Sequence, residues 1–245
     1  MYKLTVTSEE IEKLPLGAFK GQIHVINRPG FEYLRALSYL KSQTVIGFDT
    51  ETRPVFSPTA KHNKVALLQL SGPDHAYLFR LNQMGLRRRL CSILSNPVIL
   101  KIGAASHDDV CGLQKRASFV EAGFVDLQKI AWQWGIRDKS VKKLAANILG
   151  VKISKTQQLS NWEADELSES QQLYAATDDW VCREMYLKLL KTEKHPLSEE
   201  EKLPPEQRPK PVEAVPAQEA EPTQNRKRRR HKRKKNDKTV SEKGS

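Results

Sequence analysis

The segment from Thr44 to Asp49, with the sequence TVIGFD, limits the fold more than any other part of the chain. It is apolar on both faces, which is typical of a central strand that is covered on two sides. Other β-branched apolar segments alternate with helical patterns. The segments lie at 22–26, 65–70, 76–79 and 98–102, and the helical patterns at 31–41, 84–94, 107–117, 126–134, 140–149 and 168–191. The alternation predicts an α/β fold with a mixed β-sheet and flanking helices.

Composition divides the 245 residues into four parts. Residues 1–21 form an N-terminal extension, and residues 22–191 contain the predicted sheet and helices. Seven of the 13 prolines lie between Pro196 and Pro222, and no Phe, Trp or Tyr follows Tyr186. Such a segment buries too little apolar surface to offset its ordering entropy. We therefore expect a Pro-rich, acidic, disordered linker at 192–225 and a basic, disordered C-terminal tail at 226–245.

The formal net charge of +12 is concentrated in that tail. Residues 226–238 contain ten Lys and Arg side chains and one Asp, which gives +9. A run of this kind binds phosphate backbones without sequence specificity, and it also has the form of a nuclear localisation signal. The alternative is a solubilising end that binds nothing.

Several classes of protein are excluded by what the sequence lacks. It has no apolar run of the roughly 18 residues that a membrane-spanning helix requires, and no apolar signal-peptide segment at its start. Its three cysteines, Cys91, Cys111 and Cys182, have no CxxC spacing, which argues against a disulfide framework and a thiolate zinc site. We therefore expect no membrane partner and a cytoplasmic location, with the nucleus as the alternative if the basic tail is a localisation signal in a eukaryote.

Asp49 and Glu51 lie at the carboxyl end of the predicted central strand. Because side chains alternate along a strand, both carboxylates project from the same face, at the edge where open α/β sheets place their sites. The two charges repel each other unless a cation lies between them. For this pair taken alone, the alternative is a solvated strand end that continues into a polar loop.

Asp109 is the next candidate, in the helical pattern that begins at His107. Acidic residues in a first turn are commonly only caps or partners of the helix dipole. At about 100° per residue, however, Asp109 lies beside the apolar stripe that includes Val110 and Leu113. Asp108 points away from this stripe, so we expect Asp109 to face inward and Asp108 to face solvent.

Tyr174 and Asp178 lie on one stripe of the last long helical pattern. Their spacing continues through the apolar residues Val181, Met185 and Leu189. A carboxylate in line with core residues costs several kcal/mol in desolvation, so Asp178 needs a cation, hydrogen-bond donors or a proton. Asp179 is expected to point to solvent beside Arg183. A tyrosine on such a stripe is also consistent with a plain core residue.

Together these stretches supply four inward-facing carboxylates with no matching cluster of His or Cys. Oxygen ligands of this kind suit Mg²⁺ or Mn²⁺, and two such ions about 3.5–4 Å apart are a familiar arrangement for phosphodiester cleavage. The acidic cluster and the basic tail therefore both indicate a nucleic acid as the partner.

Three segments resemble the motifs of the DEDDy group of 3′-5′ exonucleases, the ribonuclease D-like branch of the DnaQ-like, ribonuclease H-like superfamily. The first is IGFDTET, with Asp49 and Glu51. The second is KIGAASHDDVCGL, with Asp109, and the third is YAATD, with Tyr174 and Asp178. The motifs stand in the family's order across roughly residues 22–191, which makes the resemblance specific.

The resemblance implies a ribonuclease H-like sheet with helices on both faces, and a metal-dependent 3′-5′ exonuclease with two Mg²⁺ or Mn²⁺ ions. Asp49, Glu51 and Asp178 would hold the ion that carries the attacking water. Asp49 and Asp109 would contact the second ion, and Tyr174 would orient the water or help to remove its proton. The substrate would be a single-stranded or overhanging 3′ end of RNA or DNA, and the products nucleoside 5′-monophosphates.

The competing interpretation is a catalytically inactive exonuclease fold that serves as a nucleic-acid-binding scaffold. Loss of a metal-binding carboxylate would indicate such a scaffold, and none of the four is missing. The chain carries no helical HRDC domain after the catalytic part, so we expect further substrate contacts from the body of the domain or from the tail.

Overall fold

The computed structural model describes residues 1–57, 63–203 and 207. Contacts divide the chain into Met1–Arg208 and Pro209–Ser245, and every described residue belongs to the first part. The basic tail predicted at 226–245 lies outside the described residues, as do residues 204–206 and 208–225 of the linker predicted at 192–225.

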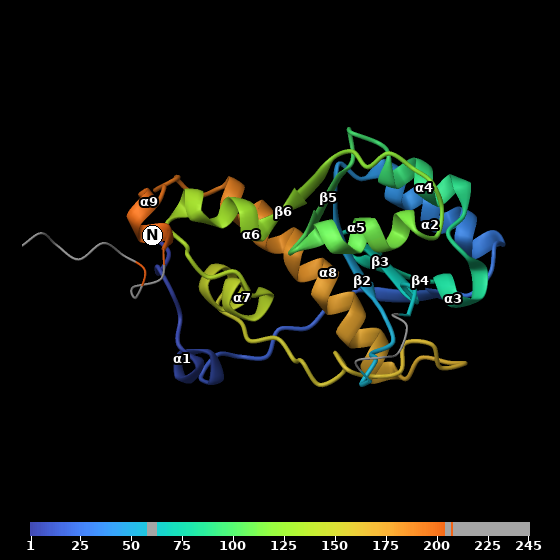
Figure 1. Ribbon diagram of the computed structural model, residues 1–245, viewed down its shortest axis with the longest axis horizontal. Helices are drawn as coiled ribbons and strands as arrows, with labels where there is room; N and C mark the ends of the chain where they lie inside the picture. Colours follow the sequence, from blue (N-terminus) through green and yellow to red (C-terminus); the bar gives the residue numbers. More distant parts are fainter. Residues whose placement is uncertain (58–62, 204–206, 208–245) are drawn as a thin grey trace, which may run out of the picture. The chain divides into compact units, whose positions relative to one another are not determined.

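A mixed sheet of six strands forms the centre of the described domain (Figure 1). Across the sheet the order is β1 (Gln22–Ile26), β4 (His75–Arg80), β3 (Leu67–Ser71), β2 (Val45–Glu51), β5 (Leu100–Gly103) and β6 (Phe124–Asp126). Strand β3 is antiparallel to both of its neighbours, and the remaining pairs are parallel. Strands β3 and β4 form a hairpin, and β2 lies in the interior of the sheet, so the predicted central strand is confirmed.

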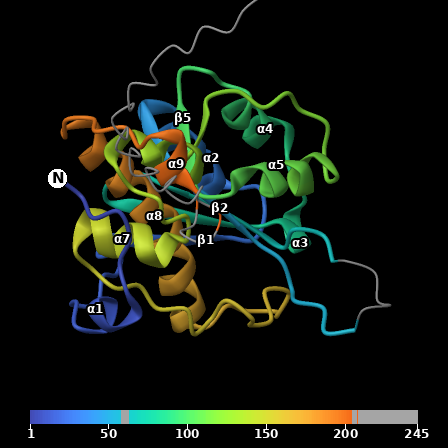
Figure 2. The same ribbon diagram turned by 60° about the vertical axis from the view of Figure 1, so that its left-hand side comes forward.

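Helices cover both faces of this sheet. They are α1 (Ser8–Glu12), α2 (Phe31–Ser42), α3 (Leu81–Met84), α4 (Arg88–Leu94), α5 (Ser106–Gln114), α6 (Leu127–Ile130), the 3₁₀ helix η1 (Ala131–Trp134), α7 (Val141–Leu149), α8 (Glu169–Leu190) and α9 (Glu199–Lys202). Helices α2, α4 and α5 share one apolar core with the sheet, which includes Leu37, Leu90, Leu113 and Phe48. Helix α8 crosses the other face, with α7 beside it (Figure 2). The predicted two-sided α/β architecture is confirmed.

Helix α8 packs against the backbone of β2 at Gly47. A Cβ atom on Gly47 would lie 2.0 Å from the carbonyl oxygen of Asp179 and 2.6 Å from Oγ of Ser71. Only glycine leaves room for this approach. Asp179 is fully buried here, so the prediction that it points to solvent was wrong.

Three details of the predicted elements differ from the structure. The pattern at 84–94 predicts one helix, but Gly85 adopts a left-handed conformation (φ 67°) that ends α3 before α4 begins. The pattern at 126–134 divides into α6 and the tighter η1. Strand β6 was not predicted, because three residues are too few to show a periodic pattern.

Residues on either side of the predicted domain pack against it. In the N-terminal extension, Glu12 pairs with Lys142 at 3.1 Å and with Lys152 at 3.3 Å. The first residues of the predicted linker also make contacts, since Trp134 Nε1 donates to the carbonyl oxygen of Thr192 at 3.0 Å. The domain observed here therefore extends to both sides of the range 22–191.

Two expectations from composition concern the described residues. None of the helices within them combines the length and the apolar character needed to cross a membrane. Cys91, Cys111 and Cys182 are all free thiols, and Cys91 and Cys182 are buried.

Candidate active site

Strand β2 carries Asp49 and Glu51 at its carboxyl end, on the face that α8 covers. Gly47, Asp49 and Glu51 are alternate residues and therefore project from the same face of β2. Because Gly47 contacts α8, this is the face that α8 covers. One oxygen of Asp49 accepts the backbone N–H of Thr50 at 2.8 Å. Asp49 is thus placed by a strand in the middle of the sheet.

Asp109 approaches β2 from the first turn of α5. Its carboxylate accepts a hydrogen bond from the Thr50 hydroxyl, which joins α5 to β2. Asp108 is exposed, so the predicted orientations of the two aspartates are confirmed. The start of α5 is held by Asp126 of β6, which accepts the backbone N–H of Ala105 at 3.0 Å. Ala105 has a left-handed conformation (φ 59°) that an alanine adopts only where the surroundings hold it.

Helix α8 brings Tyr174 and Asp178 to the same edge of the sheet. A capping box at Ser168 and Gln171 begins this helix, as the S-x-x-Q pattern indicates. Tyr174 and Asp178 then stand one turn apart on the side that faces β2.

A cavity of about 300 Å³ lies between these elements, and we call it the acid cavity. It is lined by Asp49, Thr50, Glu51, Ser140, Val141, Ile153, Lys155, Gln158, Tyr174 and Asp178. Four of the five predicted site residues therefore share one cavity. The fifth, Asp109, is bonded to Thr50 in its wall.

The protein does not compensate the charge of the β2 carboxylates. Burial raises the pKa of Asp49 well above its ordinary value, and the charges of Asp109, Asp178 and Glu51 raise it further. Burial likewise raises the pKa of Glu51 to about 9, and Asp178 and Asp109 add to the effect. The charged forms of both groups are therefore destabilised in the absence of a cation.

The pKa values of the two helix aspartates, Asp178 and Asp109, are also raised, but by less. Burial raises the pKa of Asp178 to about 6, against a hydrogen bond from Tyr174 and the charge of Lys155. Burial raises the pKa of Asp109 to about 6, against the hydrogen bond from Thr50. The pKa of Tyr174 is raised by burial and by Asp178, so its hydroxyl keeps its proton. Tyr174 is therefore a hydrogen-bond donor at neutral pH.

The donor set fits a hard divalent cation. Four carboxylates that repel one another at a buried position are stabilised by positive charge, and oxygen ligands suit Mg²⁺ and Mn²⁺. In the acid cavity the charge that opposes theirs is Lys155. Within the described ranges, no three His, Cys, Asp or Glu side chains already surround a point where an ion would sit. The fit therefore rests on the chemistry and charge of the donors.

These pKa shifts predict how stability depends on pH. A carboxyl group whose folded-state pKa is raised stabilises the fold below its unfolded pKa, near 4, and this contribution is lost as the pH rises through the folded value. Without metal ions, we expect the unfolding temperature to fall between pH 5 and 9, first through Asp109 and Asp178 and then through Glu51. Thermal melts in a chelator, repeated with Mn²⁺ or Mg²⁺, measure this. Melts that neither pH nor metal ions affect would contradict the assignment.

Several cavity residues give no signal in the sequence. Lys155 and Gln158 lie in an irregular segment between α7 and α8, where no periodicity marks a face. Two lysines in the first turn of α7 form ion pairs with carboxylates. Lys142 pairs with Glu12 at 3.1 Å, and Lys143 pairs with Asp138 at 3.1 Å.

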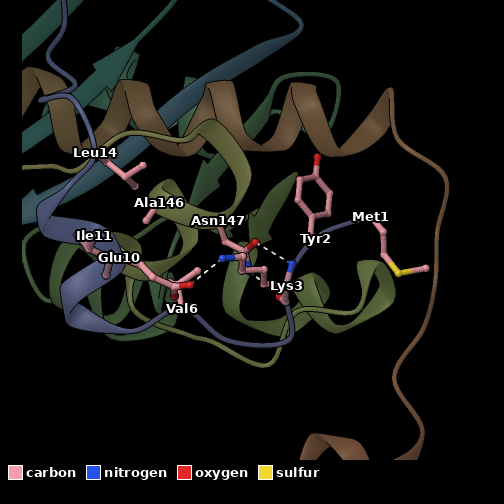
Figure 3. Close-up of a pocket in the computed structure, with 9 residues that line it drawn as sticks. All are labelled: Met1, Tyr2, Lys3, Val6, Glu10, Ile11, Leu14, Ala146 and Asn147. Carbon is pink, nitrogen blue, oxygen red and sulfur yellow. Dashed lines mark hydrogen bonds and ion pairs between the residues drawn. The ribbon is translucent and has the colours of Figure 1, made fainter.

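A different pocket, of about 310 Å³, lies between the N-terminal segment and α7 (Figure 3). Lys3 and Asn147 exchange two hydrogen bonds beside it, from Lys3 N to Asn147 Oδ1 at 3.0 Å and from Asn147 Nδ2 to Lys3 O at 2.6 Å. Val6 and Ile11 pack there against Ala146. None of the predicted site residues lines this pocket, which anchors the N-terminal segment to α7.

The mixed six-stranded sheet with helices on both faces agrees with the fold that the three motifs predict. A sequence model described as 3′-5′ exonuclease matches residues 29–193. The chain therefore belongs to the 3′-5′ exonuclease family, as the three motifs predict.

Relatives and a solved structure agree with this membership. The bifunctional 3′-5′ exonuclease/ATP-dependent helicase WRN of Mus musculus is 34% identical over 161 residues, which are 61% of this chain and 11% of WRN. Exonuclease 3′-5′ domain-containing protein 2 of Mus musculus is 31% identical over 163 residues, 62% of this chain and 25% of that protein. Escherichia coli RNase D has the same fold, with a TM-score of 0.60 at 23% identity over 71% of this chain and 45% of that chain. The chain thus spans a quarter or less of the two curated relatives.

Proposed function

We propose that this chain is a metal-dependent 3′-5′ exonuclease that hydrolyses the terminal phosphodiester bond of a nucleic acid and releases nucleoside 5′-monophosphates. The observation that carries the proposal is the acid cavity, in which Asp49, Glu51, Asp178 and Tyr174 converge and to which Thr50 joins Asp109. Membership of the exonuclease family supports it, and both relatives named above carry 3′-5′ exonuclease in their names.

Each residue has a role that follows from its position. Asp49, Glu51 and Asp178 would hold one divalent ion, and Asp49 and Asp109 a second. Two bound ions supply an activated water nucleophile and positive charge for the transition state. Tyr174, which keeps its proton, donates a hydrogen bond that orients the water. Lys155, the cation that lines the same cavity, attracts the phosphate that is cleaved.

The proposal predicts which substrates are degraded. With Mg²⁺ or Mn²⁺, the full chain should shorten 5′-labelled single strands and 3′-overhanging duplexes of RNA or DNA by one nucleotide at a time. A circular single strand should stay intact, because it offers no 3′ end. Gel analysis of the strands and chromatography of the products measure both effects.

The inactive scaffold makes the opposite prediction. If the chain bound these oligonucleotides but shortened none of them with either metal, the scaffold would replace the exonuclease as the function. Cleavage of the circular strand would indicate an endonuclease instead.

A further inference from the structure

A second cavity, of about 560 Å³, is lined by Asp109, which does not line the acid cavity. It is lined by the end of β2, by the segment that leads into β3, and by α5. Thr50 lines both cavities, so they meet at the residue that is hydrogen-bonded to Asp109. We call this second cavity the lysine groove, after Lys64 and Lys115 in its lining.

The two lysines come from opposite walls of this groove. Lys64 belongs to the segment before β3, and Lys115 caps the C-terminal end of α5. Gly112 of α5 lets these walls approach each other, because a Cβ atom there would lie 2.7 Å from Cγ2 of Val65. Lys64, the neighbour of Val65, is thereby held close to α5.

Both lysines are exposed. Among the described residues, neither ammonium group makes a hydrogen bond or an ion pair. Nearby Arg53 differs, because it pairs with Glu163 at 3.6 Å. The lysine groove therefore presents two exposed lysine side chains beside the acidic centre.

We propose that the lysine groove binds the sugar–phosphate backbone of the strand on the 5′ side of the cleaved bond, while the terminal nucleotide occupies the acid cavity. This inference rests on the proposed function. A strand carries one phosphate per nucleotide, and Lys and Arg contacts to phosphates supply most of its affinity. The terminal nucleotide brings only the phosphate that is cleaved, whereas the remaining strand brings many and is repelled by the carboxylates. The remaining strand therefore leaves the cluster of carboxylates on the side of Lys64 and Lys115.

The volumes of the two cavities agree with a terminal nucleotide in the acid cavity and an upstream strand in the lysine groove. The acid cavity, at about 300 Å³, is at the small end of the range for pockets that enclose a single small ligand. The lysine groove is nearly twice as large. Asp108 is exposed in the same groove, and its negative charge would repel a phosphate there. Removal of this charge should therefore strengthen binding of the strand.

The test compares two substrates in a variant with both Lys64→Ala and Lys115→Ala. For a single strand of about 12 nucleotides, KM should rise about tenfold with kcat unchanged, and the slope of log affinity against log salt should fall by about 1 to 2. For the p-nitrophenyl ester of thymidine 5′-monophosphate, which has no upstream strand, both constants should stay as in the wild type. Asp108→Asn should lower KM for the long strand.

Matched controls separate this effect from a general loss of charge. The double variant Lys41→Ala and Lys188→Ala removes two exposed lysines that line neither cavity, and it should leave both substrates unaffected. The proposal would be overturned if KM for the long strand rose equally in the two double variants. It would also be overturned if the Lys64→Ala and Lys115→Ala variant showed the same rise in KM for both substrates. Strand binding is also measured by fluorescence anisotropy in an Asp178→Asn background. If the wild type hydrolysed neither substrate, the proposed function would fail, and the anisotropy would still decide whether the groove binds the strand.

Discussion

Replacing Asp178 with asparagine should lower kcat for nucleotide release at least about a thousandfold. The carboxylate lines the same cavity as the β2 acids and Tyr174, and an amide has neither the charge nor the two anionic oxygens that a divalent ion requires. A thousandfold loss corresponds to about 4 kcal/mol of transition-state stabilisation, which is in the range of metal-ion catalysis. Binding of the strand should remain, because the lost charge repels phosphates.

The same substitution should stabilise the protein in the absence of metal ions. At pH 8 Asp178 is charged at a buried position, because its raised pKa of about 6 is already exceeded. Removing that charge should raise the unfolding temperature by a few degrees. Glu169→Gln, at the exposed start of the same helix, is the control and should change neither kcat nor the unfolding temperature. A variant that retained nucleotide release would remove Asp178 from the site.

Replacing Gly47 with alanine should cost about 3 kcal/mol of the free energy of unfolding. The new Cβ would lie 2.0 Å from the carbonyl oxygen of Asp179, an atom fixed inside α8, so the whole helix must move away from β2. The same movement carries Asp178 and Tyr174 away from Asp49. Because displacements of about 1 Å at a catalytic site cost about a hundredfold, kcat/KM should fall by at least that factor.

Chemical denaturation and steady-state kinetics measure these two effects. Gly30→Ala is the matched control, because an added Cβ at Gly30 meets no atom within 4 Å. It should cost less than about 1 kcal/mol and leave kcat/KM unchanged. A Gly47→Ala protein with normal stability would show that α8 does not lie directly on the backbone of β2.

The strands and long helices were predictable because each carries a clear periodic pattern over many residues. The TVIGFD segment is apolar on both faces because α8 covers one face of β2 and α5 lies on the other. Asp49 and Glu51 were predictable for the same reason, since alternation along β2 fixes their common face.

The prediction for Asp179 failed because it assumed that α8 buries a single stripe. The helix instead crosses the sheet at backbone distance and buries residues on several sides, including Ala175, Ala176 and Cys182. The contribution of Lys155 was not predictable either, because an irregular segment has no period from which the direction of a side chain follows. Both depend on how close separate elements approach each other, which local patterns do not encode.

The packing of the chain ends has a consequence for dissecting the domain. Phe19 lies outside the family match of 29–193, yet it is buried against Ala76 and Ala176, and its backbone N–H donates to Thr177 Oγ1 at 3.1 Å, one residue before Asp178. Thr192, near the other limit of the match, accepts a hydrogen bond from Trp134. A fragment trimmed to the limits of the match would lack Phe19 and would expose Ala176 on α8, the helix that also carries Tyr174 and Asp178. We therefore expect a fragment that begins at residue 29 to be less stable than one that includes Phe19.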